Sequence, residues 1–299
     1  GDAASLGADE RVGVLHALRD AAEKDPWFRN ALWVSHPFGP LARADMAAEY
    51  EALLRDPHRG PGHASFIDCV FDALQHGQSM PTLVPVLETW VQDGSEPSDL
   101  RVGAYKAWKR CAGFVVSKAL SWLQTIKTGA TPDADDELCG ALLCDLYPAY
   151  VAPALIFDHW HIPKRQSKFG RYRWFWDRAL WAQTPHDGFA ALAEGWWRLH
   201  PAITEVRDYD AAKMPSKVLT AALEHAGDHA SDATLYDWLG LCLDEYGSSR
   251  LEDQQHTVRA WLAERPDRMK AVTAVGLLDT RPDAQGHRPF SKAEARLHG

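Results

Sequence analysis

The sequence predicts an all-α protein, an irregular HEAT-like helical-repeat array or α-solenoid, and three observations support this fold class. Apolar residues recur at three- and four-residue spacing along nearly the whole chain, which is the period of a helix with one buried face. The alternation of apolar and polar residues that marks a β-strand is almost absent. Turn-forming residues interrupt the helical pattern at intervals of roughly 12 to 20 residues, which fits helix pairs stacked in series. A compact helical bundle is the alternative arrangement.

The interruptions separate the predicted helices. Between the interruptions at 92–99 and 127–136, residues 97–127 are predicted to form one long helix or two helices with a break near Gly113. In Thr131-Pro132 and Thr184-Pro185 a hydroxyl precedes a proline, which is a helix-start pattern. The interruptions are, in chain order, HPFGP at 36–40, DPHRGPG at 56–62, QDGSEPSD at 92–99, KTGATPDADD at 127–136, QTPHDG at 183–188 and RPDAQGHRP at 281–289.

Polar, acidic and turn-forming residues cluster at 127–136, and this cluster predicts a division of the chain. We expect an N-terminal helical subdomain at 1–127 and a helical-repeat region at 128–299 that continues it. The chain begins at Gly1 without an initiator methionine and ends just after a helix-start pattern at Ser291 to Glu294. We therefore expect the whole to be a fragment of a larger protein.

Composition limits the class of protein. The chain is 46% hydrophobic and 24% charged, and no apolar run is long enough for a membrane span, so no membrane partner is predicted. The formal charge of −9 argues against a general nucleic-acid-binding protein, although it allows a local basic site. The five cysteines show no CxxC pairing, which is typical of reduced core thiols and predicts a cytoplasmic protein.

The stretch GRYRWFWDRALW at 170–181 holds five aromatic and four charged residues. On a helix, one wide apolar face is formed by Tyr172, Phe175, Trp176, Ala179 and Leu180, and we expect this face to be core. A different side of the helix carries two arginines and two tryptophans, namely Arg171, Trp174, Arg178 and Trp181.

Upstream of this stretch, no acidic residue occurs between Asp158 and Asp177, so the segment forms a local basic patch. Arginine beside tryptophan can bind a planar anion or a partner protein. Alternatively, both helix faces pack against neighbours, and the arginine stems cover the rims of the tryptophans. The predicted contact residues are Lys164, Arg165, Lys168, Arg171, Trp174, Arg178 and Trp181.

A second candidate site is EHAGDHASD, where His225 and His229 have the spacing that places two imidazoles on one helix face, as in a zinc site. Gly227 disfavours a continuous helix there, so a helix end followed by a new N-cap at Ser231 is the competing interpretation. We predict no metal site from this motif.

Several catalytic motifs are missing from the sequence. It has no GxxxxGK[ST] phosphate loop, no GxGxxG after a strand and no GxSxG nucleophile elbow. We therefore predict no catalytic residue and no cofactor for this chain. A more specific assignment comes from a resemblance to a protein family.

The segment 136–197 resembles part of the helical region that follows the NTPase core in bacterial NACHT-type STAND proteins, which are associated with antiviral defence. The matching features are LLCDLYP at 142–148, a helix beginning near Pro153, GRYRWFW at 170–176 and TPHD before the next helix; RAWLAERPDRMKA at 259–271 matches more weakly. In that family the phosphate loop belongs to the NTPase domain, and the helical region receives or relays a trigger.

The resemblance implies a non-catalytic sensor or interaction region. Its expected partners are a protein or trigger molecule and the other domains of the parent chain. Two alternatives are kept: an all-helical metal-dependent hydrolase that uses some of the 14 histidines, and a nucleic-acid or nucleotide sensor that uses the basic patch.

Overall fold

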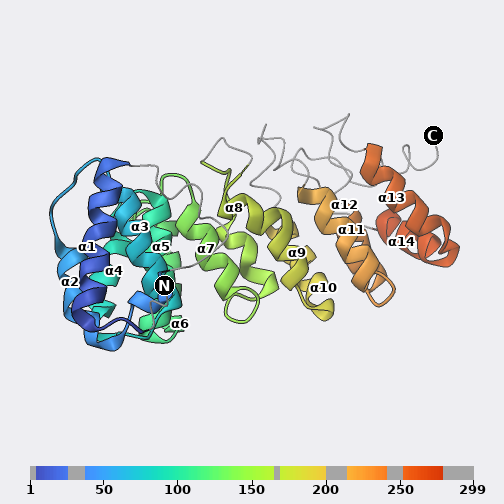
Figure 1. The fold of residues 1–299 in the computed structure, drawn as a ribbon. Helices are drawn as coiled ribbons and strands as arrows, with labels where there is room; N and C mark the ends of the chain where they lie inside the picture. Colours follow the sequence, from blue (N-terminus) through green and yellow to red (C-terminus); the bar gives the residue numbers. More distant parts are fainter. Residues whose placement is uncertain (1–4, 26–37, 165–168, 200–213, 241–251, 279–299) are drawn as a thin grey trace. The chain divides into compact units, whose positions relative to one another are not determined.

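The computed structural model describes residues 5–25, 38–164, 169–199, 214–240 and 252–278 (Figure 1). Every regular element in these ranges is a helix and none is a strand, so the predicted all-α fold class is confirmed for the described chain. Internal contacts divide the chain into two compact units. The first unit comprises residues 1–146 and 163–177, and the second comprises residues 147–162 and 178–299.

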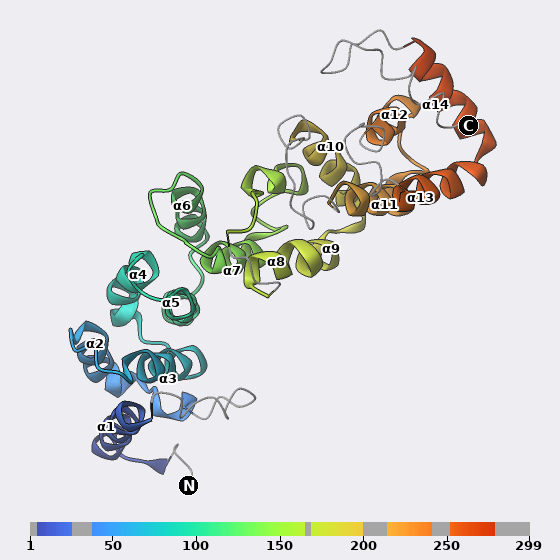
Figure 2. The same cartoon turned by 90° about the horizontal axis from the view of Figure 1, so that it is seen from above.

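Two rows of helices make up the first unit, as Figure 2 shows. In one row each helix packs on the next: α1 (Ala8–Lys24), α3 (His63–His76), α5 (Ser98–Ala112) and α7 (Glu137–Leu146). The second row holds α2 (Ala47–Arg55), α4 (Val84–Gln92) and α6 (Val116–Lys127). Short 3₁₀ helices lie at η2 (Gly39–Leu41), η3 (Ala44–Met46) and η4 (Pro81–Leu83). Within this unit the order of contacts is that of stacked helix pairs.

Residues 97–127 form two helices rather than one. Gly113, with φ +63°, ends α5 in a backbone conformation that favours glycine, and α6 begins three residues later. Buried aromatic rings pack α5 and α6 together. The ring centroid of Trp122 lies 4.6 Å from that of Trp108 and 6.2 Å from that of Tyr105. The break predicted near Gly113 is confirmed, and the rings fix α6 against α5.

The polar segment 127–136 does not divide the chain. Thr131 and Asp133 are buried, and Asp136, which directly precedes α7, is fully buried with φ +63°. Both Thr125 and Thr131 lie inside the first unit, where the Thr131 hydroxyl donates to the Thr125 hydroxyl at 2.9 Å. The structure thus separates its units after Leu146 instead of at the predicted 127/128 boundary, because this loop is packed into the first unit.

The aromatic stretch is helical from 171 to 183, in three parts. It consists of α8 (Arg171–Trp174), the π-helical turn η6 (Phe175–Ala179) and α9 (Leu180–Gln183), and the first unit ends at Asp177 within the π turn. All five residues of the predicted apolar face are buried, whereas Trp174 is 55% exposed. The helical phase predicted from the sequence is therefore confirmed.

Helices also lie in two rows within the second unit (Figure 2). One row contains α10 (Phe189–Leu199), α12 (Asp232–Gly240) and α14 (Pro266–Leu278), and α11 (Met214–Ala226) packs on α13 (Glu252–Ala263) beside it. The 3₁₀ helix η5 (Pro153–His159) packs along α10, and η7 (His186–Gly188) precedes it. Trp196 of α10 is buried between Phe157 and Trp160, whose ring centroids lie 5.1 and 6.0 Å away.

Replacing Phe175 by alanine is expected to lower the free energy of unfolding by about 3–5 kcal/mol, since the ring is fully buried and its loss leaves a cavity. Trp174→Ala, one residue away on the exposed side, is the matched control and is expected to cost about 0.5 kcal/mol or less. Urea unfolding of both variants measures the difference. Equal losses for the two variants would contradict the helical phase.

Candidate interaction site

Three buried carboxylates surround the start of α7. Asp133 accepts the backbone N–H of Leu138 at 3.4 Å and of Cys139 at 2.8 Å, and thereby caps the first turn of α7. Arg101 of α5 is also buried and lies 3.9 Å from Asp133. Burial raises the pKa of Asp133, while the N–H of Cys139 and the charge of Arg101 oppose the rise.

The other two carboxylates bind the segment that re-enters the first unit at residue 163. Asp136 accepts the backbone N–H of Lys164 at 2.7 Å and lies 2.9 Å from its ammonium. Glu137 accepts the backbone N–H of Arg171 at 3.1 and 3.2 Å, with the Arg171 Nε at 3.7 Å. A buried carboxylate is tolerated when it is paired and hydrogen-bonded, so these contacts hold α8 on α7.

Gly140, one turn beyond Glu137, brings the two backbones together. A Cβ at this position would lie 2.2 Å from the backbone nitrogen of Tyr172, so only glycine allows this approach. Tyr172, Phe175 and Trp176 then fill the space beneath α8 and are all buried. The orientation of α8 within the first unit is fixed by both polar and apolar contacts.

We define the α8 surface as Phe169, Arg171 and Trp174, which lie on the outer side of this helix and just before it. Phe169 is 81% exposed and Trp174 is 55% exposed, and the Arg171 side chain is 42% exposed. Since the opposite face of α8 is buried, the indole of Trp174 cannot turn into the core without displacing it. The surface therefore presents two large aromatic groups and a guanidinium from a fixed backbone.

The structure separates the other predicted contact residues. Lys164 is bound to Asp136, and its ammonium also donates to the Asp133 carbonyl at 2.8 Å, so it supports the fold of the first unit. Arg178 and Trp181 belong to the second unit. Arg165 and Lys168 lie outside the described residues.

Trp181 lines a hollow of about 430 Å³ within the second unit. Its other lining residues are Phe189 and five residues of α11: Lys217, Thr220, Ala221, Glu224 and His225. The His225 ring stacks on the Phe189 ring, with centroids 4.2 Å apart. The rings of His186 and His225 make a T-shaped contact, with centroids 5.1 Å apart. Two residues that the sequence analysis assigned to different sites, Trp181 and His225, thus line one hollow.

The acidic residues of EHAGDHASD are paired with arginines. Asp228 accepts two hydrogen bonds from Arg265, at 2.6 and 3.3 Å, and Asp232 accepts one from Arg268 at 2.6 Å. The helix α11 ends at Ala226, and the Ser231 hydroxyl accepts the N–H of Thr234 at the start of α12. The motif is thus a helix end and a new N-cap, and within the described ranges no three His, Cys, Asp or Glu side chains are grouped to hold a metal ion.

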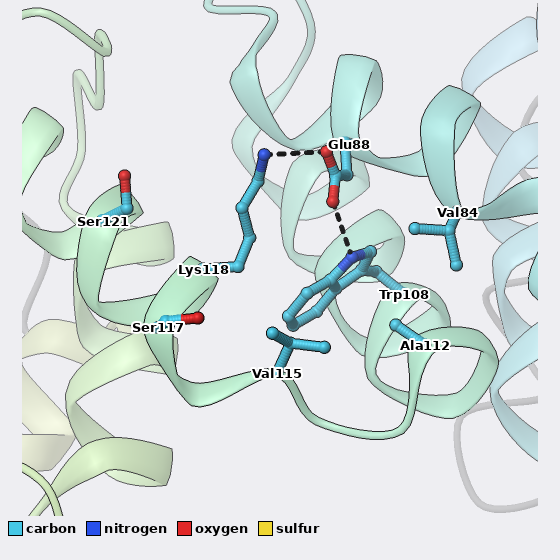
Figure 3. A pocket seen from close by; sticks show the side chains of 8 residues that line it. All are labelled: Val84, Glu88, Trp108, Ala112, Val115, Ser117, Lys118 and Ser121. Carbon is cyan, nitrogen blue, oxygen red and sulfur yellow. Dashed lines mark hydrogen bonds and ion pairs between the residues drawn. The ribbon is translucent and has the colours of Figure 1, made fainter.

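A further hollow of about 330 Å³ lies in the first unit between α4, α5 and α6 (Figure 3). The carboxylate of Glu88 accepts the Trp108 indole N–H at 3.3 Å and lies 2.7 Å from the Lys118 ammonium. In Figure 3, Val84 and Ala112 lie on one side of the indole, and Ser117 and Lys118 on the other. Sequence reasoning did not find this site because its eight lining residues match no motif and come from three helices and a connecting loop: Val84, Glu88, Trp108, Ala112, Val115, Ser117, Lys118 and Ser121.

Comparison of the chain with protein-family models, curated proteins and solved structures finds no match. Over the described ranges, none of the helices has the length and apolar character needed to cross a membrane. Four cysteines in these ranges form no disulfide, namely Cys69, Cys111, Cys139 and Cys144. Burial raises the pKa of Cys144 to about 11, so this thiol is protonated at neutral pH and weakly nucleophilic. Cys242 lies outside the described residues.

Neither chelator treatment nor added Zn²⁺ is expected to change the melting temperature. Asp228 and Asp232, the two acidic residues that could join the histidines of EHAGDHASD as metal ligands, are already bound to arginine. His225→Ala and His229→Ala measured with and without Zn²⁺ provide the comparison. A zinc-dependent rise in melting temperature that both substitutions abolish would contradict the assignment of this motif as a helix end and N-cap.

Proposed function

We propose that this chain is a non-catalytic interaction region of a larger bacterial STAND-type NTPase, and that it receives a protein partner on the α8 surface. The resemblance to the helical region of NACHT-type proteins supports the first part. The resembling range 136–197 includes α7 and α8, which pack on each other through Glu137 and Gly140. The resembling residues thus form a common structural element in this chain.

The exposure of Trp174 is the observation that carries the second part. Its indole is 55% exposed although Phe175 and Trp176, its neighbours in sequence, are buried. Tryptophan and arginine are enriched among the residues that contribute most of the binding energy at protein interfaces, and phenylalanine is enriched in interfaces relative to the rest of the surface. A large aromatic group on a fixed backbone loses little conformational entropy on binding, which favours a protein partner at this surface.

Charge indicates the chemistry of the partner. Arg171 presents a guanidinium on the surface, and burial together with the positive charge of Arg171 lowers the pKa of the nearby Lys106. An acidic side chain next to an apolar one would complement these cations and Trp174. Nucleic acid is less favoured because the whole chain carries a formal charge of −9, which repels a polyanion.

In a parent NTPase of this family, such contact would serve as the trigger that the helical region passes to the NTPase domain, in a cytoplasmic defence response. The described residues offer no grouped metal ligands in favour of the hydrolase alternative. We therefore retain the interaction region as the proposed function.

Affinity purification of the tagged chain from its native cells, compared between matched variants, tests this proposal. Trp174→Ala is expected to lower the yield of a specific partner about tenfold or more, because a central aromatic at an interface contributes about 2 kcal/mol or more. Tyr150→Ala removes an aromatic of similar exposure, 50%, from the second unit and should leave the yield unchanged.

Two outcomes would contradict the proposal. In the first, Trp174→Ala and the unsubstituted chain recover the same proteins at the same yield. In the second, the chain binds single-stranded oligonucleotides in a salt-dependent way that Trp174→Ala weakens through loss of base stacking, which would favour the nucleic-acid sensor instead.

A further inference from the structure

We propose that Lys106 of α5 is a reactive lysine whose side-chain nitrogen takes an acyl group from an acyl thioester, and that this modification regulates the α8 surface. Lys106 does not itself belong to that surface. The regulatory part rests on the proposed function, since it requires that a partner binds at α8. Both parts follow from the charges that surround this lysine within the first unit.

The Lys106 side chain is half-buried, and no ion pair joins it to any other described residue. The carboxylate of Asp145 on α7 is already engaged. Its Oδ2 accepts the Tyr105 hydroxyl at 2.8 Å and the Lys109 ammonium at 2.6 Å. A lysine that is partly removed from water without an ion-pair partner is destabilised in its charged form.

Two positive charges also act on Lys106. Lys109 lies one turn further along α5 on the same side of the helix, and Arg171 comes from α8. Burial lowers the pKa of Lys106 most, and the charges of Arg171 and Lys109 lower it further. The carboxylates of Asp145 and Asp68 act against this shift and weaken it without cancelling it. At neutral pH a larger fraction of Lys106 is therefore neutral amine than in an ordinary exposed lysine.

The neutral amine is the nucleophilic form of lysine, and burial or a neighbouring cation is a recognised way to activate it. The nitrogen lone pair of Lys106 attacks the carbonyl carbon of the thioester, and the new C–N bond forms as the C–S bond breaks. The thiolate leaves with the electron pair of that bond, and the proton released by the nitrogen goes to water. The product is a neutral amide, so acylation removes one positive charge beside Arg171.

Loss of this charge would change how the α8 surface attracts a partner. Arg171 presents its guanidinium there, and an acidic partner is attracted by Lys106 as well as by Arg171. Acylation removes one of these two attractions and leaves Trp174 and the backbone of α8 unaltered. Binding of an acidic partner is therefore expected to become weaker without being abolished.

Competitive labelling of the folded chain with trace isotopic acetic anhydride tests the reactivity. The pH profile of labelling at Lys106 is expected to have its inflection at lower pH than that of a lysine model peptide in the same tube, because its pKa is lowered. With a small acetyl thioester at pH 7, peptide mass spectrometry should find Lys106 acetylated at least about threefold faster than Lys127, which is exposed at the end of α6.

Lys109→Met removes one of the two cations and leaves Asp145 free to pair with Lys106. Both effects favour the charged amine, so the inflection of Lys106 should move to higher pH and its acetylation should slow. Lys118→Met is the matched control, because it removes an ammonium that is paired with Glu88 at 2.7 Å, and it should change neither quantity. The unsubstituted chain decides the matter if Lys109→Met does not fold.

The regulatory part is tested by recovery of the partner in affinity purification. Lys106→Gln imitates the neutral acylated side chain and is expected to lower the recovery about threefold, which is typical of the loss of one charge at an interface rim. Lys106→Arg keeps the positive charge and should preserve the recovery.

An inflection of Lys106 at or above that of the model peptide would overturn the reactive lysine, and so would acetylation no faster than at Lys127. Equal recovery with Lys106→Gln and Lys106→Arg, while Trp174→Ala still lowers it, would overturn the regulation and leave the proposed function intact. Unchanged recovery in Trp174→Ala would contradict the proposed function, and the labelling experiment would still decide the reactivity of Lys106.

Discussion

The docking of α8 on α7 depends on the pairing of the buried carboxylates at the start of α7. Asp136 and Glu137 are almost inaccessible to water, and their partners are Lys164 and Arg171 on a segment that follows much later in the chain. Leaving either carboxylate unpaired would cost several kcal/mol, which strongly favours docking of residues 163–164 and 169–177 in this position. The burial of Phe175 and the outward direction of Trp174 both follow from that docking.

Much of the fold could be predicted from the sequence because it depends on local periodicity. The helical spacing identified the all-α class, Gly113 marked the break between α5 and α6, and the phase of 170–181 identified Tyr172 and Phe175 as core. The buried carboxylates could not be predicted in this way. TPDADDE reads as a polar loop, and the partners that allow its burial lie 28 and 34 residues away, at Lys164 and Arg171.

The same distinction applies to the candidate sites. Trp174 was predictable because its exposure follows from the helical phase, whereas the structural role of Lys164 depends on a tertiary contact with Asp136. In EHAGDHASD the local spacing suggested a possible metal site, but Asp228 pairs with Arg265, 37 residues further along. The hollow at Trp108 is assembled from three helices, and no local pattern in α4, α5 or α6 encodes it. Local sequence indicates which side of a helix is exposed, but it does not identify the partner of a buried charge.

Amide hydrogen exchange in Glu137→Ala tests the central role of the buried carboxylates most directly. We expect the amides of Arg171 to Trp174 to exchange at least about tenfold faster, because the carboxylate that accepts the Arg171 N–H is lost, while the amides of α3 keep their protection. Unchanged exchange at Arg171 to Trp174 would contradict the account. Equal loss of protection in α3 and α8 would contradict it as well, since the carboxylate would then support the whole unit instead of the docking of α8.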